Sequence, residues 1–174
     1  MRTLLVVLST SLFATIAACA CATRAQSSMN RAADFVARME KQAPTHDDIP
    51  LRTYEIRDLD HDGKFEVLEH ISAYEDAPGF LNVEISPAFE WINIYSEKNG
   101  RFVDEAREFP SFLNEREEHY DFWLRVIEHP EVLDQDSQKL IENNKKEFRE
   151  VISGYLQKIE TLAHGLNLQI RSDG

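Results

Sequence analysis

The body of this chain lacks cysteine, because the two cysteines, Cys19 and Cys21, both fall within the first 21 residues. The folded part can therefore form no disulfide and perform no thiol chemistry. Common catalytic motifs are also missing: there is no Gly-x-Ser-x-Gly, no His-Glu-x-x-His, no phosphate-binding loop and no dinucleotide-binding fingerprint. We find no internal repeat and no second domain. At 174 residues the chain is expected to be one domain behind a leader.

Positive charge is scarce: 19 Lys and Arg stand against 31 Asp and Glu, for a formal net charge of −12. A surface of this sign repels phosphate backbones and anionic lipid headgroups. The balance argues against nucleic acid as a partner and favours cations or a basic protein partner.

No apolar run is long enough to cross a bilayer. The run from Leu4 to Ala18 follows a single basic residue, Arg2, and falls short of the roughly 20 residues that a spanning helix needs. It has the size of the apolar core of a secretory signal peptide. We therefore expect export, with residues 1–18 as the signal peptide.

The end of this run, Ile16-Ala17-Ala18-Cys19, resembles the lipobox of bacterial lipoproteins. The resemblance implies that Cys19 is diacylated and becomes the mature N-terminus, and two acyl chains would anchor the protein stably. Because Ala20 rather than aspartate follows the cysteine, similarity to enterobacterial lipoproteins implies no retention at the inner membrane, and hence an outer-membrane or periplasmic location. The alternative is ordinary cleavage at Ala18-Cys19-Ala20 or Ala20-Cys21-Ala22, which would release a soluble protein.

Hydrophobic periodicity predicts an α+β domain over residues 29–174, behind a tether at 19–28. We expect a small antiparallel, hairpin-rich sheet of four or five strands, packed by an N-terminal helix and two C-terminal helices. The elements predicted along the chain are a helix from 29 with Ser28 as N-cap, a loop at 45–50, strands at 53–57, 81–85, 91–95 and 102–103, a turn at 98–100, a helix from Ser111 to His129, a helix from 137 to 164 capped by Gly165, and a short edge strand at 168–170.

The stretch from Asp58 to Glu69 is where residue types and spacing together prescribe a chemistry. Its acids match the positions of a twelve-residue calcium loop: Asp58, Asp60 and Asp62 at positions 1, 3 and 5, the Lys64 carbonyl at 7, Glu66 at 9 and Glu69 at 12, with Gly63 allowing the sharp turn at 6. A polar hairpin turn is the plainer alternative. However, nothing except an ion favours gathering five mutually repelling carboxylates into twelve residues.

The segment after the loop fits either a helix, as in an EF-hand, or a strand. We favour the strand, because Pro50 leaves little room for a helix before Asp58 and no second calcium loop is present to form the usual pair. Strand–loop–strand versions of Asp-Leu-Asp-x-Asp-Gly-Lys-x-Glu resemble the calcium hairpins of FG-GAP (integrin-propeller) repeats. That resemblance covers about fifteen residues, Tyr54 to Leu68, and implies a site but no propeller. It makes Glu66 the direct ligand, whereas an EF-hand would use Glu69.

Two further groups of residues give weaker indications of function. Glu115, Glu118 and His119 share a helical face, but a transition metal there would need a further ligand from elsewhere, so a solvated surface is the simpler interpretation. The aromatic residues Trp91, Tyr95, Tyr120 and Trp123 are spaced for core packing, with a ligand groove as the alternative.

These observations lead us to expect an exported, lipid-anchored binding or interaction module with a structural calcium loop. One variant is a periplasmic inhibitor or immunity-type protein that neutralises a basic toxin. A second hypothesis is a small envelope hydrolase, which a cleft with converging polar groups and a shifted carboxylate would favour. A third is a purely structural envelope component.

Overall fold

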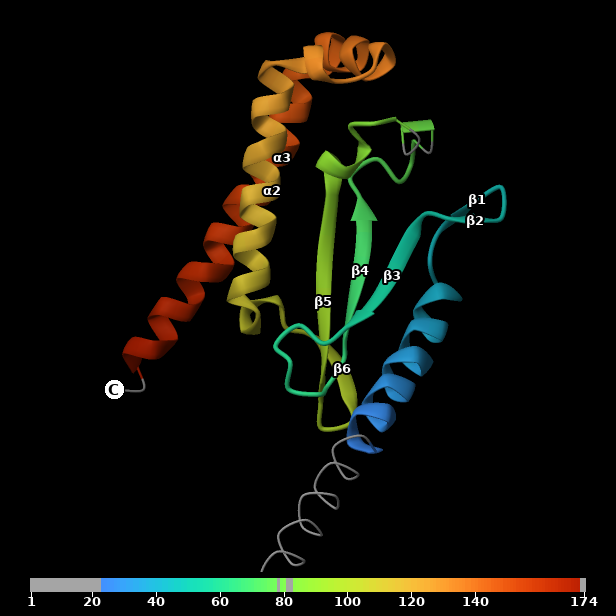
Figure 1. Cartoon of the computed structure of the whole chain (residues 1–174), viewed down its shortest axis with the longest axis vertical. Helices are drawn as coiled ribbons and strands as arrows, with labels where there is room; N and C mark the ends of the chain where they lie inside the picture. The colour runs from blue at the N-terminus through green and yellow to red at the C-terminus, as the bar shows by residue number, and fades with distance from the viewer. Residues whose placement is uncertain (1–22, 78, 81–82, 173–174) are drawn as a thin grey trace, which may run out of the picture.

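Residues 52–72 form an antiparallel hairpin in a computed structural model of the chain, which describes residues 23–77, 79–80 and 83–172 (Figure 1). Strand β3 (Arg52–Arg57) pairs with β4 (Glu66–Ser72), and Arg57 lies opposite Glu66. The segment after the loop is therefore a strand, as expected, and the helix of an EF-hand is ruled out. The predicted signal peptide and the predicted anchor residue Cys19 lie outside the described residues.

Two more strands complete the four-stranded antiparallel sheet, whose order is β3-β4-β5-β6. Strand β5 (Glu90–Lys98) contains the predicted apolar run and β6 (Arg101–Asp104) is the predicted return strand. Between them Asn99 and Gly100 have φ values of 54° and 77°, the positive pair that a type I′ hairpin requires. The α+β expectation is thus confirmed: an antiparallel sheet with one N-terminal and two C-terminal helices.

A second, two-stranded sheet was not expected. Residues 45–50, predicted as loop, form a small hairpin in which β1 (Thr45–His46) pairs with β2 (Ile49–Pro50). Its turn residues, Asp47 and Asp48, both have positive φ, at 48° and 64°. Aspartate tolerates this conformation because its short polar side chain bonds locally, but Asp-Asp is a weaker turn signal than Asn-Gly.

The strand predicted at 81–85 is wrong. Val83 to Ile85 form a bend that leads into a 3₁₀ helix (Ser86–Phe89), while residues 81 and 82 lie outside the described part. The backbone of Ile85 is helical, with φ −79° and ψ −9°, and its side chain is fully buried. The alternation of apolar residues therefore reflects burial in the core and not a pleated strand.

The N-terminal helix covers residues 23–40 of the described chain and so includes part of the expected tether. Ser28 is not an N-cap but a buried residue inside this helix, with 2% of its surface exposed. Phe35 packs against the sheet, stacking on Phe102 at 4.6 Å between ring centroids and meeting Tyr95 edge-on at 5.4 Å. The helix therefore lies against the β5–β6 hairpin, beside which it begins in Figure 1.

The C-terminal helices are α2 (Pro110–Glu128) and α3 (Gln135–Ser172). Helix α3 bends at Asn144, where φ is −127°, and its first part crosses the end of α2 before the chain turns back alongside it (Figure 1). It continues past Gly165, so the predicted cap and the edge strand at 168–170 are both wrong. None of the described helices is both long and apolar enough to span a membrane.

The hydrophobic core connects β4 and β5 to α2 and α3. Tyr120, Ile127, Phe148 and Ile152 meet Leu68 and Ile94 of the sheet, and all are 0–1% exposed. Trp91 and Trp123 are each 8% exposed, so core packing accounts for these aromatic residues.

Candidate metal centre

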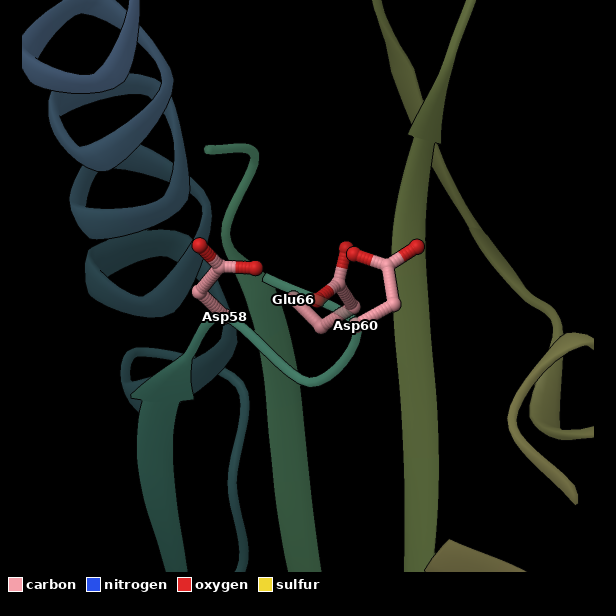
Figure 2. Close-up of side chains that lie close together, drawn as sticks. All are labelled: Asp58, Asp60 and Glu66. Carbon is pink, nitrogen blue, oxygen red and sulfur yellow. The ribbon is translucent and has the colours of Figure 1, made fainter. Parts of the chain in front are cut away.

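Three carboxylates converge where β3 ends and β4 begins. Asp58 follows β3, Glu66 opens β4, and Asp60 lies in the loop between them; one oxygen from each lies within 4.8 Å of the others. Figure 2 shows the three side chains facing one another across the loop. Asp60 is exposed, Asp58 is half-buried and Glu66 is only 4% exposed, so the cluster reaches from solvent to the edge of the core.

Backbone amides of the loop hold these carboxylates in place. The Leu59 amide donates to Glu66 Oε2 at 3.0 Å, the Gly63 amide to Asp58 Oδ2 at 3.1 Å and the Asp62 amide to Asp60 Oδ1 at 3.1 Å. Gly63 has a φ of +81°, which glycine adopts without strain. The loop thus fixes one oxygen of each acid and leaves the other available to a ligand.

One of the remaining oxygens, Asp58 Oδ1, is buried and has no hydrogen-bond partner among the described residues. Buried polar atoms are normally paired, and an unpaired carboxylate oxygen is costly. Burial raises the pKa of Glu66; the Leu59 amide opposes the shift, and the charges of Asp60, Asp62 and Asp58 add to it. A cation would relieve both costs. Several hard oxygen donors, most of them carboxylates, are the set that calcium prefers, so the residues fit this ion.

Asp62, another predicted ligand, is not among the three clustered carboxylates and is instead bonded to Lys64. Lys64 donates its backbone amide to Asp62 Oδ1 at 2.7 Å, and its ammonium group forms an ion pair with the same carboxylate. The hydrogen bond to the Lys64 side chain lowers the pKa of Asp62. Both oxygens of Asp62 therefore have partners within the loop.

Glu69 is also separate from the cluster, and it has a structural environment of its own. It is 2% exposed on β4 and accepts hydrogen bonds from Arg52 at 3.1 Å, Asn93 at 3.1 Å and Tyr95 at 2.8 Å, with the Tyr54 hydroxyl at 3.4 Å. All of these partners come from the neighbouring strands of the sheet. The geometry favours Glu66 over Glu69 as the direct ligand, as in the strand–loop–strand arrangement.

A contact from the N-terminal helix was missed by sequence reasoning. The Phe65 amide donates to Ser28 Oγ at 3.0 Å, which attaches the helix to the calcium-type loop. The two residues are 37 positions apart, and Ser28 looked like a helix cap, so no local signal connects them. Because of this bond, the N-terminal helix is attached to the loop.

The helical cluster of Glu115, Glu118 and His119 does not assemble. His119 Nε2 lies 3.1 Å from the Pro87 carbonyl, and burial lowers its pKa. Within the described residues, the grouping of three acidic or histidine ligand atoms is the one formed by Asp58, Asp60 and Glu66. A solvated surface therefore remains the simpler interpretation of the exposed glutamates.

No family model, curated protein or solved structure matches the chain. Among the described residues, the carboxylates of the β3–β4 hairpin are the strongest indication of a ligand.

Proposed function

We propose that this protein is an exported, lipid-anchored binding module whose β3–β4 hairpin is held together by calcium. The observation that carries the proposal is the buried, unpaired Asp58 Oδ1 beside Asp60 and Glu66 in the described chain. A divalent cation is the simplest partner for an oxygen so placed.

Asp58, Asp60 and Glu66 would hold the ion, with Asp62 and the Lys64 carbonyl as further ligands after a local rearrangement. Calcium would supply positive charge at the point where β3 and β4 meet the loop and the carboxylates repel one another. Because Phe65 is bonded to Ser28, the N-terminal helix would be stabilised at the same time. The ion acts as a structural clip, which suits a single loop with a Kd of about 10⁻⁴ to 10⁻³ M.

Thermal unfolding in chelator and in millimolar calcium tests this role. At about 1 mM calcium and a Kd of about 10⁻⁴ M, linkage gives about 1.4 kcal/mol of added stability. Magnesium at the same concentration should give less, because it prefers a rigid octahedral shell. Equal melting temperatures with and without calcium would contradict the proposal.

The anchor is an independent part of the proposal and rests on the lipobox-like sequence ending at Cys19. The mass of the N-terminal peptide from the wild-type protein should include two acyl chains and the residues from Cys19 onward. Cys19→Ser should move the protein from the membrane to the soluble fraction. A wild-type N-terminus that starts at another residue without lipid would show ordinary secretion instead.

The exposed face of α2 supports the inhibitor-type variant with a basic partner. Four acids, Glu115, Glu117, Glu118 and Asp121, are exposed there next to Phe122, of which 50% is exposed. An exposed aromatic side chain surrounded by acidic residues is a typical anchor for a basic protein partner. Pull-down from envelope extract should recover a basic protein that is lost with Phe122→Ser. Recovery of the same proteins by this variant would argue against the surface.

A second candidate function, a small hydrolase, is favoured by a groove of about 310 Å³ that Thr53, His70, Ser72, Ser86 and Glu90 help to line. His70 Nδ1 lies 2.9 Å from Glu90 Oε2. Burial acts to raise the pKa of Glu90, but the hydrogen bond to His70 and the charges of His70, Arg116 and His119 together lower it. A carboxylate that orients an imidazole is an arrangement suited to a general base. Hydrolysis of activated esters by the wild type and its loss in His70→Gln would support this function, whereas an inactive wild type would not.

A further inference from the structure

The N-terminal helix carries a small net positive charge in this acidic protein. Residues 23–40, which form this helix, carry three basic and two acidic side chains, whereas residues 41–174 carry 15 basic and 29 acidic ones. The helix is thus net positive on a strongly negative body. In Figure 1 it lies on the opposite side of the strands from α2 and α3.

The arginines of this helix recur every seven residues, at Arg24, Arg31 and Arg38. Seven residues are close to two helical turns, so the three side chains share one face along about 21 Å of the axis. All three are exposed, and Arg31 and Arg38 border the β5–β6 hairpin.

Between the helix and the hairpin lies a groove of about 420 Å³. Three arginines, Arg31, Arg38 and Arg101, and two acids, Asp34 and Glu97, line it, and the stacked rings of Phe35 and Phe102 form part of its wall. Arg31 already has partners: its Nε lies 2.7 and 2.8 Å from the two oxygens of Glu97, and its Nη1 donates to Ser27.

The groove contains two more guanidinium groups, those of Arg38 and Arg101. Arg38 lies 5.7 Å from the Phe35 ring centroid, and neither Arg38 nor Arg101 has an ion-pair partner in the described part of the chain. Two such groups in one groove can bind a phosphate through several hydrogen bonds.

The position of the groove indicates where its anion comes from. The helix begins no later than residue 23, four residues after Cys19, and four residues span at most about 14 Å. If Cys19 is acylated, the helix is held close to the lipid headgroups, and this step rests on the proposed anchor. We infer that the groove of Arg31, Arg38 and Arg101 docks the N-terminal helix onto the phosphate headgroups of anionic membrane lipids.

This contact defines how the module is presented. The basic helix and hairpin face the bilayer, and the acidic body faces away from it. The net charge of −12 does not prevent the contact, because repulsion from the distant acids is screened beyond about 8–10 Å at physiological ionic strength.

The test uses the mature chain, residues 19–174, with Cys19→Ser so that no acyl chain contributes. It is mixed with vesicles of phosphatidylcholine alone or containing phosphatidylglycerol, in chelator so that calcium does not bridge protein and lipid. We expect sedimentation with the anionic vesicles only. The double variant Arg38→Gln/Arg101→Gln should bind more weakly by about fivefold per charge removed.

The matched control is Arg107→Gln/Arg125→Gln, which removes the same charge from exposed sites elsewhere and should bind like the wild type. Circular dichroism verifies that each variant is folded. Equal binding to both vesicle types, or equal loss in the two double variants, would overturn the inference. Displacement by inorganic phosphate at the lipid phosphate concentration would also overturn it, by showing a site for a free anion. Because neither acylation nor calcium takes part, failure here is distinct from failure of the proposed anchor or clip.

Discussion

Glu66→Gln should change the stability of this protein in opposite directions with and without calcium. In chelator Glu66 is a buried carboxylate surrounded by like charges, and burial raises its pKa. Glutamine has the same shape and can still accept the Leu59 amide bond, which is 3.0 Å long in the wild type. Removing only the charge should therefore stabilise the protein when no ion is present.

In calcium the same substitution removes a ligand. The wild type gains about 1.4 kcal/mol at about 1 mM calcium, which corresponds to about 3–6 °C in Tm for a domain of this size. The variant should lose most of that gain, so its Tm would lie above the wild type in chelator and below it in calcium. Differential scanning calorimetry of both proteins in both buffers measures the four values.

The reversal in the order of the two melting temperatures between chelator and calcium identifies Glu66 as a ligand. A purely structural glutamate would destabilise the protein by the same amount in both buffers when it is replaced. An unchanged calcium response in the variant would refute the assignment of Glu66, whatever happens to the absolute stability.

Three further predictions follow from the same contacts. Glu69→Gln should leave the calcium response intact but lower the free energy of unfolding by about 2–3 kcal/mol in both buffers, because Arg52 loses one buried partner and keeps Glu75. Urea unfolding in both buffers measures this, and a lost calcium response would instead identify Glu69 as a ligand. Ser28→Ala should lower the free energy of unfolding by about 1 kcal/mol, because it leaves the Phe65 amide without its acceptor. The control Ser27→Ala, at an exposed position, should be close to neutral. Equal urea midpoints for the two variants would contradict this prediction. In chelator, the wild type should gain stability relative to Glu66→Gln as pH falls through the raised pKa of Glu66, because the folded state binds that proton more tightly than the unfolded state. The gain should be lost as pH rises again. A stability difference between the two proteins that stays constant from pH 7 to 4 would exclude this titration.

The elements that the sequence predicts well are those with local causes. Asn99-Gly100 predicts a type I′ turn, and the apolar run in β5 indicates a strand covered on both sides. The spacing of Asp58, Asp60 and Glu66 predicts that the three carboxylates meet in one hairpin loop. Pro50 also favours a strand over a helix before the loop. In each case neighbouring residues alone determine the conformation.

The features that were missed depend on distant partners. Ser28 looks like a cap until the Phe65 amide is placed beside it, and Glu69 looks like a twelfth-position ligand until Arg52, Asn93 and Tyr95 surround it. Residues 83–85 alternate like a strand because the core buries Ile85. Sequence periodicity records which residues are buried, but not which neighbours bury them.

The most direct test of the calcium clip is X-ray diffraction from crystals of the protein grown in calcium. The clip predicts an ion with oxygens of Asp58, Asp60 and Glu66 at about 2.3–2.6 Å, and Asp58 Oδ1 among its ligands. A loop with no ion at saturating calcium, or an ion bound by Glu69 in place of Glu66, would contradict it.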